Sequence, residues 1–146
     1  MYHATVKITV PPLTVSLVSA ASQTVGAIAA GEAVSIFGLN VGPDGRALFD
    51  DLPATILYSS PTRVDAVVPP GIAGRASASV RVDVNGTQTT LGGVPVVASA
   101  PAIFTADGSG VGQASAFNED SSPNSDSNPA GRGSLVRIRA TGRTQL

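Results

Sequence analysis

The chain has 146 residues, enough for one domain of ordinary size, and 42% of them are hydrophobic, which is enough to build a core. Charged residues make up only 13% and the formal net charge is −1, so the basic surface that nucleic-acid binding requires is missing. There are no cysteines, which excludes disulfides and thiolate metal sites, and no apolar run approaches the length of a membrane span.

The first third of the chain predicts two strands and a crossing. Apolar and polar residues alternate over residues 2–10, which predicts a half-buried strand. Pro11 and Pro12 end it, because proline cannot donate to a strand ladder. A second strand is predicted at residues 13–17. The small, polar stretch at 19–33 then predicts a crossing from one sheet to the other.

The middle of the chain predicts short strands separated by turns. The dipeptide Asn85-Gly86 takes the positive φ angles of a type I′ turn readily and is the strongest hairpin signal. A turn-rich loop is expected at residues 40–46, and Gly92-Gly93 is expected to end a strand. The predicted strands lie at residues 34–37, 54–58, 63–68, 76–84, 87–91 and 94–98.

The composition changes from Asp107 onward. Residues 118–133 are polar and predict a loop, preceded by a short strand within 114–117 and followed by a final strand at 135–140. No stretch shows a sustained helical period. The chain is therefore predicted to be all-β, an immunoglobulin-like β-sandwich with extra flanking strands at both termini.

The predicted organisation has one complete module and two partial ones. Residues 17–105 form the immunoglobulin-like module, and residues 1–16 hold a strand that resembles the end of a preceding module. Residues 130–142 repeat the shape of residues 30–38, an apolar strand behind a glycine turn. We therefore interpret residues 106–146 as a polar loop plus the first strand of a truncated following module.

One loop gathers oxygen-bearing side chains that could bind a metal ion. Hard oxygen ligands of this kind suit Ca²⁺. Their spacing does not match the EF-hand pattern, and the same composition is ordinary in solvated loops. Calcium binding and plain solvation both stay open for this loop. The candidate ligands are Asn118, Glu119, Asp120, Asn124 and Asp126.

The remaining candidates for chemistry carry little signal. His3 is the only histidine and Lys7 the only lysine, and both fall on the polar face of the first predicted strand. No Gly-x-Ser-x-Gly elbow accompanies His3, and a lysine that forms a crosslink needs an apolar site. Solvated strand residues are the simpler interpretation of both.

An acidic pair for glycoside hydrolysis could be drawn from Glu32, Asp50 and Asp51. Adjacent residues on a strand face opposite sides, so Asp50 and Asp51 would diverge if extended. Aromatic residues for sugar stacking make up only 4% of the chain. We predict no catalytic residues and no cofactor other than the possible calcium ion, and hence no enzyme.

Three motifs occur in a recognisable order: GEAVSIFG at residues 31–38, ILYSSPTRVDAVVP at 56–69 and APAIF at 100–104. Together they resemble a C-terminal, IPT/TIG-like immunoglobulin-like domain of very large secreted proteins of soil acidobacteria. The resemblance covers residues 17–142 and implies a structural role in a secreted or cell-surface protein, with no assigned activity. Family members continue with further strands, whereas this sequence ends at Leu146.

The strands predicted at the two ends of the chain suggest that the chain associates with copies of itself. Strands at residues 2–10 and 135–140 would expose unpaired backbone edges unless they pair with the core module, with each other or with a second chain. We predict a homo-oligomer formed by strand exchange. A carbohydrate- or protein-binding module and a fragment with weak hydrolase activity are the alternatives. No signal peptide precedes Tyr2, so a secreted parent is expected to carry its signal upstream.

Overall fold

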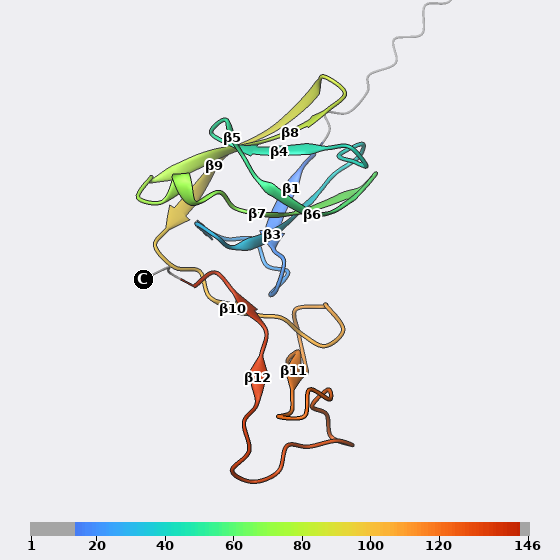
Figure 1. The fold of residues 1–146 in the computed structure, drawn as a ribbon. Coiled ribbons are helices and arrows are strands. Elements are labelled where there is room, and N and C mark those ends of the chain that lie inside the picture. The colour runs from blue at the N-terminus through green and yellow to red at the C-terminus, as the bar shows by residue number, and fades with distance from the viewer. Residues whose placement is uncertain (1–13, 144–146) are drawn as a thin grey trace, which may run out of the picture.

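The computed structural model describes residues 14–143, and the strand predicted at residues 2–10 lies outside them together with His3 and Lys7. Two sheets pack face to face, and a narrow extension leaves them at one end (Figure 1). Among the described residues, no helix is long and apolar enough to cross a membrane. The elements are β1 (Ser16–Ser19), β2 (Ile28–Ala29), β3 (Ala33–Phe37), β4 (Arg46–Phe49), β5 (Leu52–Pro53), β6 (Thr55–Ser60), β7 (Arg63–Val67), the 3-10 turn η1 (Pro70–Ile72), β8 (Ser77–Val84), β9 (Thr87–Val97), β10 (Ala102–Ile103), β11 (Ala116–Phe117), β12 (Arg137–Ile138) and β13 (Ala140–Thr141).

The two sheets confirm the prediction of an immunoglobulin-like sandwich. One has the order β1-β3-β7-β6 and is antiparallel throughout. The other has the order β2-β9-β8-β4-β5 and is antiparallel except for the parallel pair β2–β9. Because β1 belongs to the first sheet and β2 to the second, the predicted crossing at residues 19–33 is also confirmed.

The core lies between the sheets and comes from the alternation that the sequence shows. Inward side chains of β3 and β7, such as Ile36 and Val64, are 0% exposed. Val80 of β8 and Phe49 of β4 meet them from the opposite sheet. Fully burying an apolar side chain of this size contributes about 1.5–3 kcal/mol, so these layers stabilise the packing of the two sheets.

The hairpin predicted at Asn85-Gly86 is confirmed. Both residues have positive φ, 51° and 83°, as a type I′ turn requires. Val84 pairs directly with Thr87 across the turn. The Asp83 carboxylate accepts a hydrogen bond of 3.0 Å from the Gly86 backbone N–H and fixes the turn from the side.

Two sequence predictions are wrong in the second sheet. Arg46 begins strand β4 rather than ending a loop, and the sequence predicts neither β4 nor β5. Asp50 and Asp51, at φ 46° and 69°, form the tight turn that joins β4 to β5. Gly92-Gly93 does not end a strand either. β9 continues through both glycines as a bulge, because Gly93 takes a φ of 71° that reinstates the pairing with β8.

Residues 98–143 form the narrow extension below the sandwich (Figure 1), which we call the appendage. β10 pairs with β13 and β11 with β12, so the last predicted strand forms as two short strands. They are separated at Arg139, whose backbone N–H donates to Ser115 and whose carbonyl accepts from Phe104. Residues 118–133 form no regular strand, as predicted.

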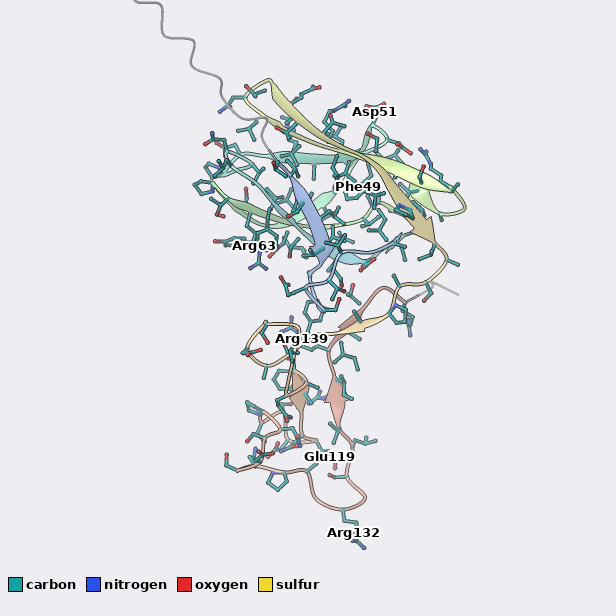
Figure 2. The ribbon with its side chains drawn as sticks, turned by 180° about the vertical axis from the view of Figure 1, so that it is seen from behind. Phe49, Asp51, Arg63, Glu119, Arg132 and Arg139 are labelled. Atoms are coloured by element: carbon teal, nitrogen blue, oxygen red, sulfur yellow. The ribbon has the colours of Figure 1, made fainter. Side chains whose placement is uncertain are left out.

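The appendage is tied to the sandwich at two places. The Ala33 backbone N–H donates to the Thr141 hydroxyl at 2.7 Å, so the two segments that repeat in the sequence touch in space. Gly110 approaches the Ser22 carbonyl so closely that a Cβ there would lie 2.2 Å from the oxygen. These contacts fix the base of the appendage, while its far end reaches away from the sheets (Figure 2).

Candidate interaction surfaces

A hollow of about 310 Å³ lies where β1 and β9 face each other at one side of the sandwich. We call it the β1–β9 groove. No charged side chain lines it within the described part of the chain, Val25 at its rim is 79% exposed, and Leu91 is half-buried. Its lining residues are Val15, Ser16, Leu17, Val25, Gly26, Leu91, Gly92, Gly93, Val94 and Pro95.

One rim of the groove is a bare strand edge. β9 pairs with β8 over residues 87–95, whereas on its other side, within the part of the chain that the structure describes, only Val96 and Val97 have a strand partner, in β2. Residues 87–95 have no strand partner on that side among the described residues. In an antiparallel ladder, pairs that exchange hydrogen bonds alternate with pairs that do not, and the pair Val84–Thr87 next to the turn is hydrogen-bonded. Gln88 and Thr90 belong to the pairs that exchange no hydrogen bonds, so their N–H groups point away from β8. Such an edge is a template for an added strand.

The opposite side of the molecule presents a second apolar edge on β6. Ile56, Leu57 and Tyr58 are 37%, 59% and 53% exposed, and a bulge between Ile56 and Tyr58 interrupts their pairing with β7. The bulge makes the edge irregular, which hinders the addition of another strand. β9 also carries a bulge, at Gly92-Gly93, so irregularity does not separate the two edges. The edge of β9 is the stronger docking candidate because the apolar β1–β9 groove lies beside it.

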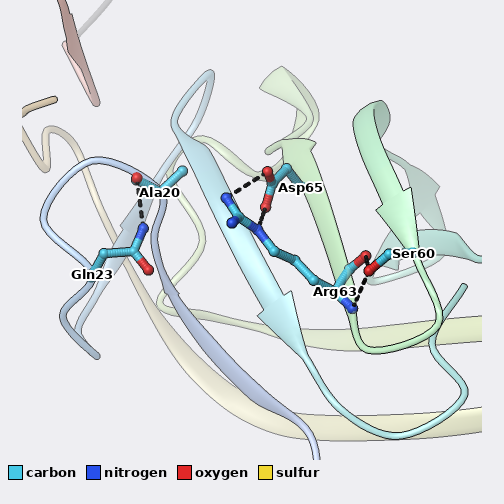
Figure 3. A network of polar contacts seen from close by, with 5 residues as sticks. All are labelled: Ala20, Gln23, Ser60, Arg63 and Asp65. Carbon is cyan, nitrogen blue, oxygen red and sulfur yellow. Dashed lines mark hydrogen bonds and ion pairs between the residues drawn. The ribbon is translucent and has the colours of Figure 1, made fainter. Parts of the chain in front are cut away.

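Arg63 of β7 covers the aromatic side chains beside that edge. Its guanidinium lies 5.6 Å from the Phe37 ring centroid and 5.8 Å from that of Tyr58. Its Nε and Nη2 also donate to the Asp65 carboxylate at 2.7 and 2.8 Å (Figure 3). The bidentate pair holds the guanidinium in place, so the two rings are engaged by a cation rather than presented as a free platform.

A smaller cavity of about 150 Å³ lies at the junction between the sandwich and the appendage, lined in part by Ser19, Glu32 and Pro101. Glu32 is only 2% exposed, and its Oε2 accepts a 2.9 Å hydrogen bond from the Ala29 N–H. Burial raises the pKa of the Glu32 carboxyl above its ordinary value, although the Ala29 N–H and the nearby Ser19 hydroxyl oppose the rise. The Ser19 hydroxyl makes no hydrogen bond of regular geometry to the Glu32 carboxylate. Glu32 fixes the turn before β3.

The structure does not bring Glu32 together with the two aspartates that the sequence offered as its partners. Asp50 accepts hydrogen bonds from Arg75 and from the Ser79 N–H, both at 2.7 Å. These bonds hold the pKa of Asp50 below its ordinary value, and the bond from the Ser79 N–H has the larger effect. Asp51 pairs with Arg81 at 2.7 Å at the end of the sandwich far from the appendage (Figure 2). The two aspartates act as turn and ion-pair residues.

The five candidate calcium ligands all lie in the appendage, and only some of them meet. Asn118 is buried, and its Oδ1 accepts a 2.8 Å bond from the Asn124 amide. Asp120 Oδ1 accepts from the Ser122 hydroxyl and N–H, which hold the pKa of Asp120 below its ordinary value. Glu119 and Asp126 are exposed. Among residues 14–143, no three acidic, histidine or cysteine side chains lie close enough together to hold a metal ion. Calcium binding by this loop therefore has no support from such a cluster and stays a prediction.

Sequence reasoning missed the β1–β9 groove. Its lining comes from segments that are far apart in the chain, around Val15, Val25 and Leu91. The available signal is the pair Gly92-Gly93, which the sequence predicts as a strand end and which in the structure forms the bulge that lines the groove. Nothing in the local pattern indicates which strand edges stay bare.

A family model with the description IPT/TIG domain matches residues 16–97, more than half of the chain. The match begins at the first residue of β1 and ends at the last residue of β9, so it covers both sheets of the sandwich and stops before the appendage. No curated protein and no solved structure matches the chain.

Proposed function

The chain belongs to the IPT/TIG domain family, and we propose on that basis that it is a non-catalytic structural and interaction module of a secreted or cell-surface protein. Domains of this family are generally structural or interaction modules. The proposed location rests on the resemblance of residues 17–142 to domains of large secreted proteins.

The observation that carries the interaction role is the β1–β9 groove with its bare strand edge. The groove is apolar and uncharged, and it runs beside backbone donors and acceptors that no described strand satisfies. Addition of a strand to such an edge provides backbone hydrogen bonds for affinity and side-chain pockets for specificity. A peptide segment fits this surface better than a small ligand does.

The outer face of the first sheet favours a protein partner over a carbohydrate. Sugar binding needs a flat aromatic platform, and the two rings on this face, Phe37 and Tyr58, are both engaged by the Arg63 guanidinium. The C-terminal strands β12 and β13 pair within the chain, with β11 and β10. We therefore propose protein binding, and specifically self-association through the strand predicted at residues 2–10, as the function of the module.

Light scattering of the full chain over a wide range of concentrations tests this proposal. We expect the mean mass to rise above the 14.5 kDa of one chain as concentration increases. Because the groove carries no charged side chain, the dissociation constant is expected to change little between low salt and about 0.5 M salt. A monodisperse monomer at every concentration contradicts self-association.

A further inference from the structure

We propose that the β1–β9 groove receives residues 2–10 of a second copy of this chain, added as a strand on the bare edge of β9, an inference that rests on the proposed interaction role and names its site and its partner segment. The donor segment lies outside the described residues, so the case for it comes from its sequence and from the geometry of the acceptor.

The donor and the acceptor match in length and in pattern. Residues 2–10 number nine, as do residues 87–95, the part of β9 whose outer edge has no strand partner among the described residues and which includes the bulge at Gly92-Gly93. A strand presents alternate side chains to opposite faces, so an added strand turns one face toward the core and the other toward solvent. The inward face of this donor consists of Tyr2, Ala4, Val6, Ile8 and Val10.

The β1–β9 groove has exposed apolar surface against which the inward face of residues 2–10 can pack. Leu91 and Val84 project from the second sheet, pack against the core and remain only half-buried. Val25 stands at the rim with 79% of its surface exposed. The polar face of the donor, which carries His3 and Lys7, would meet no charged group of the groove and would remain in solvent.

The direction of β1 favours a donor from a second copy over the chain's own N-terminus. Ser16 and Leu17 lie level with residues 91–95, whereas Ser19 lies level with residues 100–102, so β1 advances in the same sense as β9. The chain therefore enters β1 from the side of the Asn85-Gly86 turn. A segment continued straight back would leave the sandwich past that turn.

The two prolines oppose a reversal that would bring the segment back. A residue that precedes proline is restricted to extended conformations, and this applies to Val10 before Pro11 and to Pro11 before Pro12. A proline at the third position of a type I turn is also disfavoured. Two copies that exchange N-terminal segments satisfy both edges without such a turn.

A matched pair of substitutions on β9 tests the acceptor in the full chain. Thr90→Pro removes a backbone N–H that points away from β8, a position at which edge strands tolerate proline. Thr90→Ala removes the same side chain but keeps the N–H. We expect Thr90→Pro to weaken self-association about tenfold or more and Thr90→Ala to leave it unchanged, with equal far-UV circular dichroism. Equal self-association of the two variants overturns the acceptor site.

A second matched pair tests the donor. Val6→Asp places a charge on the inward face, whereas Thr5→Asp places the same charge on the outward face. We expect only Val6→Asp to shift the chain toward the monomer in light scattering. Equal behaviour of the two variants overturns the predicted face.

Disulfide trapping distinguishes a second copy from the chain's own segment. The chain has no cysteine, so each introduced thiol is unique. With residues 2–10 aligned over residues 87–95, residue 5 lies opposite Thr90 in a parallel pair and residue 7 lies opposite it in an antiparallel pair. Chains with Thr5→Cys or with Lys7→Cys are each mixed with chains that carry Thr90→Cys and oxidised, and a covalent heterodimer is expected for one of the two mixtures. A chain that carries both substitutions of that mixture and closes only on itself overturns the exchange. A monomer at all concentrations contradicts the proposed function as well, whereas an oligomer insensitive to both matched pairs contradicts this inference alone.

Discussion

Replacement of Phe49 by alanine probes whether the short strand β4 holds the second sheet to the core. The Phe49 side chain is 0% exposed and is the largest of the fully buried side chains, opposite Val80 of β8. Removal of a buried aromatic ring costs about 3–5 kcal/mol, through lost transfer energy and the cavity that remains. A loss of about 4 kcal/mol lowers the ratio of folded to unfolded chains about a thousandfold, a large share of the 5–15 kcal/mol that stabilises a typical domain.

Urea unfolding followed by circular dichroism measures this loss, and Phe37→Ala is the matched control. Phe37 is half-buried on the outer face beneath Arg63, so its truncation leaves no cavity in the core and is expected to cost only about 1 kcal/mol. The midpoint should fall for Phe49→Ala with the denaturant slope unchanged. Equal costs for the two substitutions would refute the assignment of Phe49 to the core.

Three further outcomes follow from single residues. The folded-state pKa of Glu32 is raised above its ordinary value of 4.5, so its stabilising contribution is present below the unfolded pKa and is lost as pH rises through the folded pKa. Over that interval the unfolding free energy of the parent chain minus that of Glu32→Gln should fall as pH rises, as urea unfolding at a series of pH values measures. Gly86→Ala should lower stability by about 1 kcal/mol because φ is 83°, whereas Gly92→Ala, which has open space and no positive φ, should not, as thermal melting can show. If the appendage loop binds calcium, millimolar calcium raises the melting temperature by a few degrees relative to chelator and Asp120→Asn removes the rise; equal melting temperatures refute the site.

The parts of the fold that the sequence predicts are those with a local signal. Strands such as β8 alternate apolar and polar residues over their full length, and alternation of period two is diagnostic of a strand with one buried face. Asn85-Gly86 specifies its own turn because both residues tolerate positive φ. These signals predict individual strands and one turn without reference to distant residues.

β4 escaped prediction because its local signal is short and its neighbours mislead. The strand has four residues, so alternation shows only at Ala47 and Phe49. Asp50 and Asp51 follow at once, and aspartate is depleted in strands. Both adopt positive φ here, and their carboxylates are held by Arg75 and Arg81, contacts that exist only after the sheets have formed.

Gly92-Gly93 misled for a related reason. Paired glycines usually mark a strand end, but the same conformational freedom permits a bulge. Gly92-Gly93 forms a bulge rather than a strand end because β8 continues beside β9 past the two glycines, where Ala78 pairs with Val94. The local sequence does not contain that partner.

The bare edge of β9 follows from the way the chain crosses between the sheets. The segment that starts the domain first covers the edge of one sheet as β1, then crosses and covers the other sheet only as the two-residue β2. One segment divided between two edges cannot protect both along their full length, so among the described residues the outer edge of β9 nearer the Asn85-Gly86 turn has no strand beside it. Exposed edges of this kind associate with other strands unless something covers them. The crossing that completes the sandwich therefore also creates the surface through which we expect it to associate.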